Sequence, residues 1–462
     1  MSQETNSAPV TENKMGTMPI GRLVFNMSLP MMISMLVQAL YNIVDSIFVA
    51  KLSENALTAV LLAFPLQTLI IAVATGTGVG VNALLSKSLG AHKYDEANKI
   101  GINGAVLYAF SYVIFLILGL TIVKPFYMSQ IGNADVEIMD MGVSYLSTVM
   151  IFSFGIFAEI YFERVLTSTG RTIFSMTSQL CGAITNIILD PIMIFGLLGF
   201  PKLGATGAAV ATVVGQCVAA VVAFVCNHKF NHEISLSFKG YSPDFKIMGT
   251  IYAIGIPSII MQSIGSIMTY AMNRILIGFS STAAAVFGVY FKLQSFFFMP
   301  LFGLNNATIS IIAYNYGARK PHRITKTLKI SCTAALCIMT VGLLVFQFFP
   351  DALLGMFNPS QAFLEIGRVA LRTISWSFPI AAVCIALGAS FQALGNGIYS
   401  TIVSLCRQLV VLLPAAYLLS LTGQVQRVWL AFPIAEVVSG TVTFICFTRI
   451  YRQKIRPLFH VL

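Results

Sequence analysis

The sequence predicts an all-α integral membrane protein with twelve transmembrane helices in two six-helix lobes, related by a pseudo-twofold axis along the membrane normal. Three observations lead to this fold class. The 462 residues are 57% hydrophobic and only 10% charged. Apolar runs long enough to cross roughly 30 Å of hydrocarbon recur along the whole chain. Motifs of the first half also return in the second half, in the same order.

Twelve apolar segments are long enough to span the bilayer. Several exceed the minimum of about 20 residues, so tilted or bent helices are expected. An even number of spans places both termini on the same side of the membrane. In chain order, the predicted spans are 23–50, 56–86, 100–122, 139–162, 172–195, 205–225, 247–279, 284–313, 327–349, 362–387, 399–421 and 428–450.

The distribution of basic residues predicts the orientation. Lysines and arginines gather in the segments on the same side as the termini, and Arg164 and Arg171 are counted among them. Cytoplasmic segments carry such an excess of positive charge, so both termini are predicted to be cytoplasmic. The first nineteen residues are polar and lack the order of a secretory signal, so the first span is expected to act as an uncleaved anchor. The opposite loops hold only Lys51, Lys124, Lys202 and Arg427.

The two halves of the chain resemble each other at an offset of 227 residues. The letters GAHK at 90–93 return as GARK at 317–320, and Pro30 returns as Pro257. Because each half has six spans, both enter the membrane from the same side, and transporters built from such parallel repeats handle their substrate between the halves. The predicted parts are an N-terminal lobe (1–226), a cytoplasmic inter-lobe linker (227–246) and a C-terminal lobe (247–462).

The sequence gives little support for an enzyme. All five histidines lie in loops or at the tail, and neither an HExxH nor a GxSxG motif is present. There is no Walker A sequence, so ATP is not expected as the energy source, and no cofactor is expected. The net charge of +11 is explained by the orientation in the membrane rather than by nucleic acid as a partner. The eight cysteines occur singly, so neither disulfides nor metal clusters are expected.

Several motifs together resemble the multidrug and toxic compound extrusion (MATE) transporters, in particular their bacterial multidrug-export branch. Each motif is loose by itself, but their order, spacing and duplication are specific, and the likeness covers almost the whole chain. The motifs are LPMMISMLVQALYNIVDSIFVA, TGTGVGVNALLSKSLGAHK, LTSTGRTIFSMTSQLCGAITNIILDPIMIFGLLGFPKLGATGAAVAT and, in the second half, FQALGNGIYSTIVSLCRQ.

The resemblance implies export of amphipathic, mostly cationic organic compounds in exchange for inward movement of H+ or Na+. It also implies a multi-pass protein of the bacterial cytoplasmic membrane, expected to be a monomer. In the family, the first, second, seventh and eighth spans line the substrate cleft. Aromatic, thioether and amide side chains on these spans suit delocalised cations. The expected cavity residues are Gln38, Tyr41, Phe64, Met261, Met268, Phe287 and Phe291.

Two acids lie inside apolar spans, where charged groups are costly and are functional by default. Asp45 lies 23 residues after Arg22, about 34 Å along a continuous helix, and Asp190 lies 20 residues after Gly170 on a span of the same direction. Their depths therefore match. Asn186 is one turn before Asp190 on the same helix face, and Pro191 leaves a backbone carbonyl without its helical donor.

Such a cluster of oxygen ligands has two uses. As ionised carboxylates, Asp45 and Asp190 coordinate Na+; with a raised pKa, they hold a proton instead. Three structural alternatives stay open: Asp45 satisfies the amide of Gln38 or Asn42, Asp190 serves a helix kink, and Asn186 joins helices.

Glu163 stands where the resembling family often has a polar partner of the cation cluster. Its depth places it near the cytoplasmic end, away from Asp190, unless the fourth span is bent, and a solvated helix end is an equal alternative. The second half has no equivalent set of acids, since Asp45 corresponds to Met272. There Arg407 and Glu436 are expected to form a structural ion pair. A flippase for lipid-linked sugars is the rival function, but it would need a more basic cavity to meet pyrophosphate.

Overall fold

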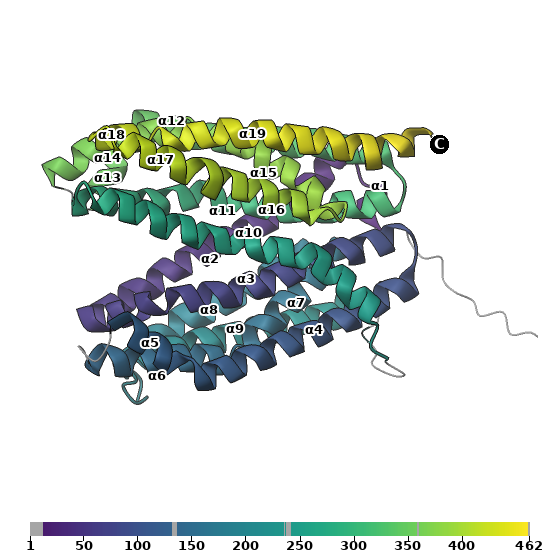
Figure 1. Cartoon of the computed structure of the whole chain (residues 1–462). Helices are drawn as coiled ribbons and strands as arrows, with labels where there is room; N and C mark the ends of the chain where they lie inside the picture. Colours follow the sequence, from purple (N-terminus) through teal and green to yellow (C-terminus); the bar gives the residue numbers. More distant parts are fainter. Residues whose placement is uncertain (1–12, 132–135, 235, 237–241, 358–359, 461–462) are drawn as a thin grey trace, which may run out of the picture.

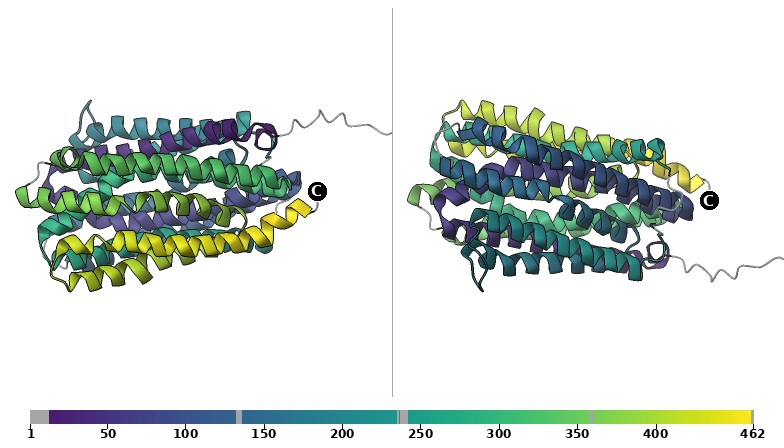
Figure 2. Two further views of the ribbon diagram at one scale, coloured as in Figure 1. Left: turned by 90° about the horizontal axis from the view of Figure 1, so that it is seen from above. Right: turned by 90° about the horizontal axis from the view of Figure 1, so that it is seen from below.

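A computed structural model of the chain describes residues 13–131, 136–234, 236, 242–357 and 360–460. The described residues form two helical bundles that lie side by side (Figure 1). The N-terminal lobe contains α2 to α9, and the C-terminal lobe contains α10 to α19. Both bundles show several layers of roughly parallel helices when turned by 90° (Figure 2).

The N-terminal lobe follows a four-residue helix, α1. In order, the helices are α1 (Lys14–Thr17), α2 (Ile20–Leu52), α3 (Glu54–Gly90), α4 (Tyr94–Thr121), α5 (Val123–Ile131), α6 (Val136–Ile151), α7 (Phe154–Ser168), α8 (Thr172–Phe195) and α9 (Ala205–Phe230).

The C-terminal lobe repeats this order and adds three irregular turns. Its elements are α10 (Phe245–Ile277), α11 (Ser281–Gly317), α12 (Pro321–Phe348), α13 (Pro350–Gly355), α14 (Gln361–Ser375), α15 (Phe378–Ala393), α16 (Gly397–Leu405), a π-helical turn (Cys406–Leu412), α17 (Leu413–Ser420), α18 (Val425–Val428), α19 (Ala431–Ile450), a second π-helical turn (Tyr451–Ile455) and a 3-10 turn (Arg456–His460).

The predicted twelve spans are confirmed, with two of them bent. Ten helical segments of the described chain are individually long and apolar enough to cross a membrane. The other two spans are helix pairs, α6 with α7 and α14 with α15, which bend by 42° and 47°. The two bends occupy equivalent places in the two lobes.

Local backbone details confirm the internal repeat. Ser53 and Ser280 cap α3 and α11, and each side chain accepts a hydrogen bond from the backbone N–H three residues later. His92 and Arg319 both adopt a left-handed conformation, with φ of 56° and 54°. Both pairs are 227 residues apart. The lobes are therefore copies of one structural plan, joined between the end of α9 and the start of α10.

The connection between the lobes is shorter than the predicted linker of 227–246. Residues 227–230 continue α9 as helix, and residues 245 and 246 already belong to α10. Part of the predicted linker, 235 and 237–241, lies outside the described residues, as do residues 1–12 of the predicted polar leader.

The lobes touch mainly near one end of the bundle, which we call the terminal face because α1 and the last described turn, Arg456–His460, lie there (Figure 1). The opposite end, at Ser53 and Ser280, is the distal face, toward which α2 and α3 diverge from α10 and α11 (Figure 1). At the terminal face, a Cβ on Gly90 would clash with the carbonyl of Tyr314, and one on Gly317 with the carbonyl of Lys87. Only glycine permits so close a backbone contact.

Hydrogen bonds between the lobes continue from this contact toward the middle of the membrane. Ser310 donates to the Asn82 side chain at 3.0 Å. Thr75 donates to the Gln262 side chain at 2.8 Å. The interface is thus polar and tightly packed in the half of the molecule nearer the terminal face.

Residues 13–18 form a clasp that bridges both lobes at the terminal face. Arg323 of α12 donates to the carbonyls of Met15 at 2.9 Å and Met18 at 2.8 Å. On the N-terminal lobe, Asn13 donates to Glu233 at 2.7 Å and to the carbonyl of Thr169 at 3.0 Å. The clasp therefore ties the N-terminal lobe to the C-terminal lobe.

Replacing Arg323 by alanine is expected to loosen this clasp. Hydrogen bonds to a charged group contribute about 1.5–3 kcal/mol each, so protection of the backbone amides of residues 13–18 should fall at least tenfold. Hydrogen–deuterium exchange read by mass spectrometry measures this protection. Lys326→Ala, at an exposed position on the same helix, is the matched control, and equal exchange in both variants contradicts the bridging role.

The ion pair expected in the C-terminal lobe is present. Arg407 Nη1 lies 3.1 Å from Glu436 Oε1, and Ser439 donates to the other carboxylate oxygen at 2.8 Å. Arg407 belongs to the π-helical turn Cys406–Leu412, which widens the helix where the guanidinium reaches α19. Both carboxylate oxygens of Glu436 are therefore bound by residues of its own lobe.

Glu436→Gln is expected to destabilise the protein by about 3 kcal/mol, because it leaves a largely buried guanidinium without its counter-ion. Replacing both partners, with Arg407→Met and Glu436→Leu, should restore most of this stability. The apparent melting temperature in detergent measures both effects. A single variant that melts like the unaltered protein contradicts a structural role for the pair.

Candidate functional site

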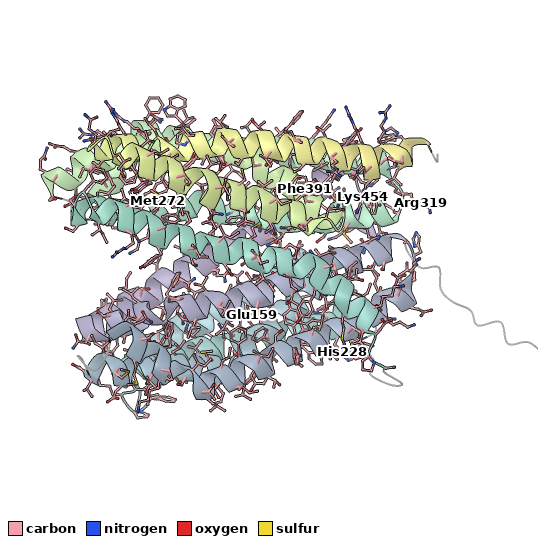
Figure 3. All side chains as sticks on the ribbon, in the orientation of Figure 1. Glu159, His228, Met272, Arg319, Phe391 and Lys454 are labelled. Carbon is pink, nitrogen blue, oxygen red and sulfur yellow. The ribbon has the colours of Figure 1, made fainter. Side chains whose placement is uncertain are left out.

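A cavity lined by both polar and apolar side chains lies inside the N-terminal lobe, between α2, α3, α7, α8 and α9. It contains about 720 Å³ of space not occupied by protein atoms, part of it open to solvent. Glu159 of α7 lies within this lobe, whereas Met272, the counterpart of Asp45 in the repeat, lies in the other lobe (Figure 3). The polar lining consists of Ser34, Gln38, Tyr41, Thr75, Glu159, Glu163, Arg164, Gln179, Asn186, Thr212 and Gln216.

Asp45 and Asp190 lie one helical turn beyond the lining residues Tyr41 and Asn186, toward the distal face. Helix α2 packs against α8, and Tyr41 and Asn186 line the same cavity, so the two acids lie at a similar depth on adjacent helices. The matching depth predicted for the two acids thus corresponds to two neighbouring groups on α2 and α8. Together they form the distal end of the polar interior.

Asn186 positions the carboxylate of Asp190. Asp190 is fully buried. In the amide orientation that satisfies both of its ends, Asn186 donates to Asp190 Oδ2 at 3.3 Å and accepts from the backbone N–H of Thr212 at 3.1 Å. Asn186 therefore joins α8 to α9, as the structural alternative expects, and also holds the carboxylate of Asp190.

Asp45 is only partly buried, and its Oδ1 atom is inaccessible to solvent yet has no hydrogen-bond partner among the described residues. A carboxylate that served only to satisfy Gln38 or Asn42 would be bonded to them. A buried oxygen without a donor is costly in a folded protein. This geometry favours a carboxylate that receives a ligand.

Glu163 lies closer to the cluster than its sequence position indicates. The bend between α6 and α7 at Phe152–Ser153 turns the second half of the span into the lobe, so that Glu163 lines the same cavity as Asn186. Its Oε2 atom accepts from Gln179 at 2.7 Å, and its Oε1 atom has no partner among the described residues. Glu163 is 2% exposed and is therefore not a solvated helix end.

Glu159, one turn before Glu163 on the same span, lines the cavity beside it. Two functional candidates escaped the sequence analysis. Gln179 is two turns before Asn186, so helical periodicity offered a signal for it. Arg164 gave no such signal, because a basic residue close to the end of a span normally indicates the orientation of the protein in the membrane. The structure shows instead that Arg164 is 3% exposed and lines the cavity.

The predicted cavity residues separate into two groups. Gln38 and Tyr41 line the cavity. Phe287 is fully buried in an aromatic cluster of the C-terminal lobe, against Phe291 and Trp429, so it does not face an open cavity in this conformation. Aromatic residues fill cores as readily as clefts, so residue type alone could not distinguish cavity-lining residues from core residues. The remaining members are Met268, which is buried in the core, Met261, which is half-buried, and Phe64, which is exposed on α3.

The two lobes differ in how they hold their intramembrane acids. Glu436 is paired with Arg407, whereas no Lys or Arg side-chain nitrogen of the described residues lies within 4.0 Å of Asp45 or Asp190. The acids of the N-terminal lobe thus remain available for a ligand. Their carboxylate and amide oxygens are the donors that suit a proton or a small hard cation.

Comparison with known proteins places this architecture in a family. The family model MatE matches residues 30–192 and again residues 257–418, so the two matches begin 227 residues apart. Among curated proteins, the FAD transporter of Shewanella oneidensis is 26% identical over 445 residues, 94% of this chain and 95% of its own length. The multidrug export protein MepA of Staphylococcus haemolyticus is 27% identical over 426 residues, 91% of each chain.

Solved structures agree over the whole chain. An outward-facing conformation of a multidrug resistance MATE family transporter of the MOP superfamily has a TM-score of 0.90 and 25% identity, over 98% of this chain and all of that one. A MOP superfamily transporter from Pyrococcus furiosus, described as having a binding pocket of reverse polarity, has a TM-score of 0.89 and 25% identity, over 98% of this chain and 99% of that one.

Proposed function

Because this chain belongs to the MatE family of membrane transporters, we propose that it is an antiporter that exports amphipathic, mostly cationic organic compounds in exchange for inward H+ or Na+. The observation that carries the proposal is the set of acids inside the N-terminal lobe: Glu159 and Glu163 line the cavity together with Arg164, and Asp45 and Asp190 lie one helical turn beyond it. If ionised, this interior attracts cations, and its acids lack basic partners within ion-pair distance.

The basic terminal face supports a cytoplasmic location for both termini, in the cytoplasmic membrane of a bacterium. Arg319 and Lys454 lie at this end of the bundle (Figure 3). With that orientation, the glycine contacts and the clasp close the cytoplasmic side, and the lobes diverge toward the outside. The conformation is then the one that releases drug and receives the coupling ion.

Coupling follows from the competition of two ligands for connected sites. An ion bound by Asp45, Asp190 and Asn186 changes the charge beside Tyr41, a residue that also lines the cavity. A ligand drives a conformational change only through its different affinity for the two states. Ion binding at the distal end therefore favours the state that opens inward, and drug binding favours the return.

Proteoliposomes with a fluorescent cation, ethidium, test the function. A sodium gradient and a pH gradient are imposed separately, each in the direction that drives export from the lumen. Uphill ethidium movement under one gradient supports antiport and identifies the ion. Absence of movement under both gradients contradicts it. A flippase would instead translocate a fluorescent lipid-linked sugar in the same vesicles, which supplies the comparison with the rival function.

A further inference from the structure

We propose that Arg164 is a specificity-determining residue that binds the oxyanion group of a transported compound, so that the cavity of the N-terminal lobe accepts zwitterionic compounds with an acidic group at one end. This inference rests on the proposed function and adds to it a substrate class. The oxyanion is a carboxylate or a phosphate, since the guanidinium pairs with both in the same geometry.

The guanidinium of Arg164 is buried and has free donors. The residue is 3% exposed, and its Nε and Nη1 atoms have no hydrogen-bond partner among the described residues. A buried unpaired charge is among the most costly features of a protein interior, and inside a membrane it marks a functional site. Arg164 also lines the cavity, which places its guanidinium beside the space that a ligand would occupy.

The neighbouring acids do not take up these donors. Glu163 precedes Arg164 in the chain, but its Oε2 atom accepts from Gln179 at 2.7 Å instead. Among the described residues, no carboxylate oxygen lies within 4.0 Å of a side-chain nitrogen of Arg164. By contrast, Arg407 of the C-terminal lobe meets Glu436 at 3.1 Å. Arg407 is therefore paired with an acid, whereas Arg164 has no such pair among the described residues.

The wall beside Arg164 leaves room for its side chain. A Cβ on Gly78 of α3 would lie 2.8 Å from Arg164 Cγ and 3.1 Å from its Nε. The same Cβ would lie 2.7 Å from the hydroxyl of Tyr108, which donates to the carbonyl of Ala74 at 2.7 Å. Gly78 thus accommodates the arginine. The Tyr108 hydroxyl donates its proton to the backbone, and among the described residues its oxygen accepts no hydrogen bond from Arg164 Nε or Nη1.

The charges are arranged along α7 for a compound with two unlike ends. Arg164 follows Glu159 by five residues, about 7–8 Å along the helix, and is nearer the terminal face. An ammonium group of the ligand would lie toward Glu159, with Asp45 and Asp190 beyond it, while the oxyanion would lie against Arg164. A purely cationic compound would use only the distal part of this arrangement.

Equilibrium binding to purified protein tests the inference without requiring transport. Norfloxacin, a zwitterion with a carboxylate, is compared with its ethyl ester, which keeps the amine but lacks the carboxylate. FAD, which the Shewanella oneidensis relative is named for, supplies phosphate oxyanions. The variants are Arg164→Gln, Arg164→Lys, and the control Arg274→Gln at an exposed position of α10.

For Arg164→Gln, the dissociation constant of norfloxacin is expected to rise about 10- to 100-fold, while that of the ester changes less than about threefold. Arg164→Lys should recover part of the affinity, and Arg274→Gln should leave it unchanged. A loss confined to norfloxacin assigns the carboxylate, and a loss confined to FAD assigns the phosphate. Equal losses of affinity for norfloxacin and its ester, or unchanged affinity for both norfloxacin and FAD, overturn the inference.

The transport assay keeps the two proposals apart. If ethidium moves uphill in the unaltered protein but Arg164→Gln weakens norfloxacin and its ester equally, or leaves the affinities for both norfloxacin and FAD unchanged, the antiport function stands and the role of Arg164 fails. If ethidium does not move under either gradient but the binding difference is present, the antiport function fails and Arg164 still selects the ligand.

Discussion

Replacing Asp45 and Asp190 together by asparagine is expected to abolish uphill drug export while the protein stays folded. Asparagine keeps the shape and the hydrogen-bonding capacity of the side chains but cannot exchange a proton or supply a charge to a cation. The ratio of drug concentrations across the membrane should therefore fall to about one. An ion that binds the inward-open and outward-open states equally does not change the balance between them. Gradient-driven ethidium accumulation in proteoliposomes measures this ratio.

The control for this prediction is Asp140→Asn, which removes an exposed acid on α6 of the same lobe. Its accumulation ratio should match the unaltered protein. The double variant should keep its melting temperature in detergent within a few degrees, because asparagine matches aspartate in shape and removes two carboxylates that have no basic partner within 4.0 Å among the described residues. A folded double variant that still concentrates ethidium would remove these two acids from the coupling mechanism.

Gly90→Ala and Gly317→Ala are each expected to push the lobes apart at the terminal face. The added methyl group clashes with the carbonyl of Tyr314 in one variant and of Lys87 in the other. Because these carbonyls are backbone atoms of long helices, they cannot relieve the clash by a change of side-chain rotamer. Overpacking of this kind costs about 1–3 kcal/mol, which corresponds to a shift of about 5- to 150-fold away from the conformation described here.

Spin labels at His228 and Lys329, on the N-terminal and C-terminal lobes near the terminal face, report this opening after the native cysteines are replaced. Pulsed electron paramagnetic resonance should show a longer distance in both glycine variants. Gly288→Ala is the matched control, because it lies on α11 like Gly317 and a Cβ there meets no atom within 4 Å. Unchanged distance distributions in Gly90→Ala would show that this contact does not hold the lobes together.

Much of the architecture could be predicted because the bilayer constrains it so strongly. Hydrophobic length set the number of spans, and the offset between GAHK at 90–93 and GARK at 317–320 revealed the repeat that the capping residues Ser53 and Ser280 later confirmed. The pairing of Arg407 with Glu436 was also foreseeable, since two opposite charges within the apolar spans of one lobe satisfy each other at least cost.

The interior of the N-terminal lobe was harder to predict, because it depends on the bend of one span and on side-chain direction. A straight fourth span would carry Glu163 away from the cluster, and the sequence gives no sharp signal for the 42° bend between α6 and α7. Arg164 illustrates the same limit. Its place near a helix end matched the rule for orientation, whereas burial of its side chain depends on Gly78 of a different helix.

The central claim is that the acids of the N-terminal lobe exchange a small cation for drug, and reversing the driving force tests it most directly. Proteoliposomes without any imposed ion gradient receive a steep ethidium gradient, and ion movement is followed with a pH dye and with radioactive sodium. The account predicts that downhill ethidium drives one of these ions uphill in the unaltered protein, and that Asp45→Asn with Asp190→Asn ends this exchange. Ethidium flux that moves no ion in the unaltered protein, or ion exchange that persists in the double variant, would contradict it.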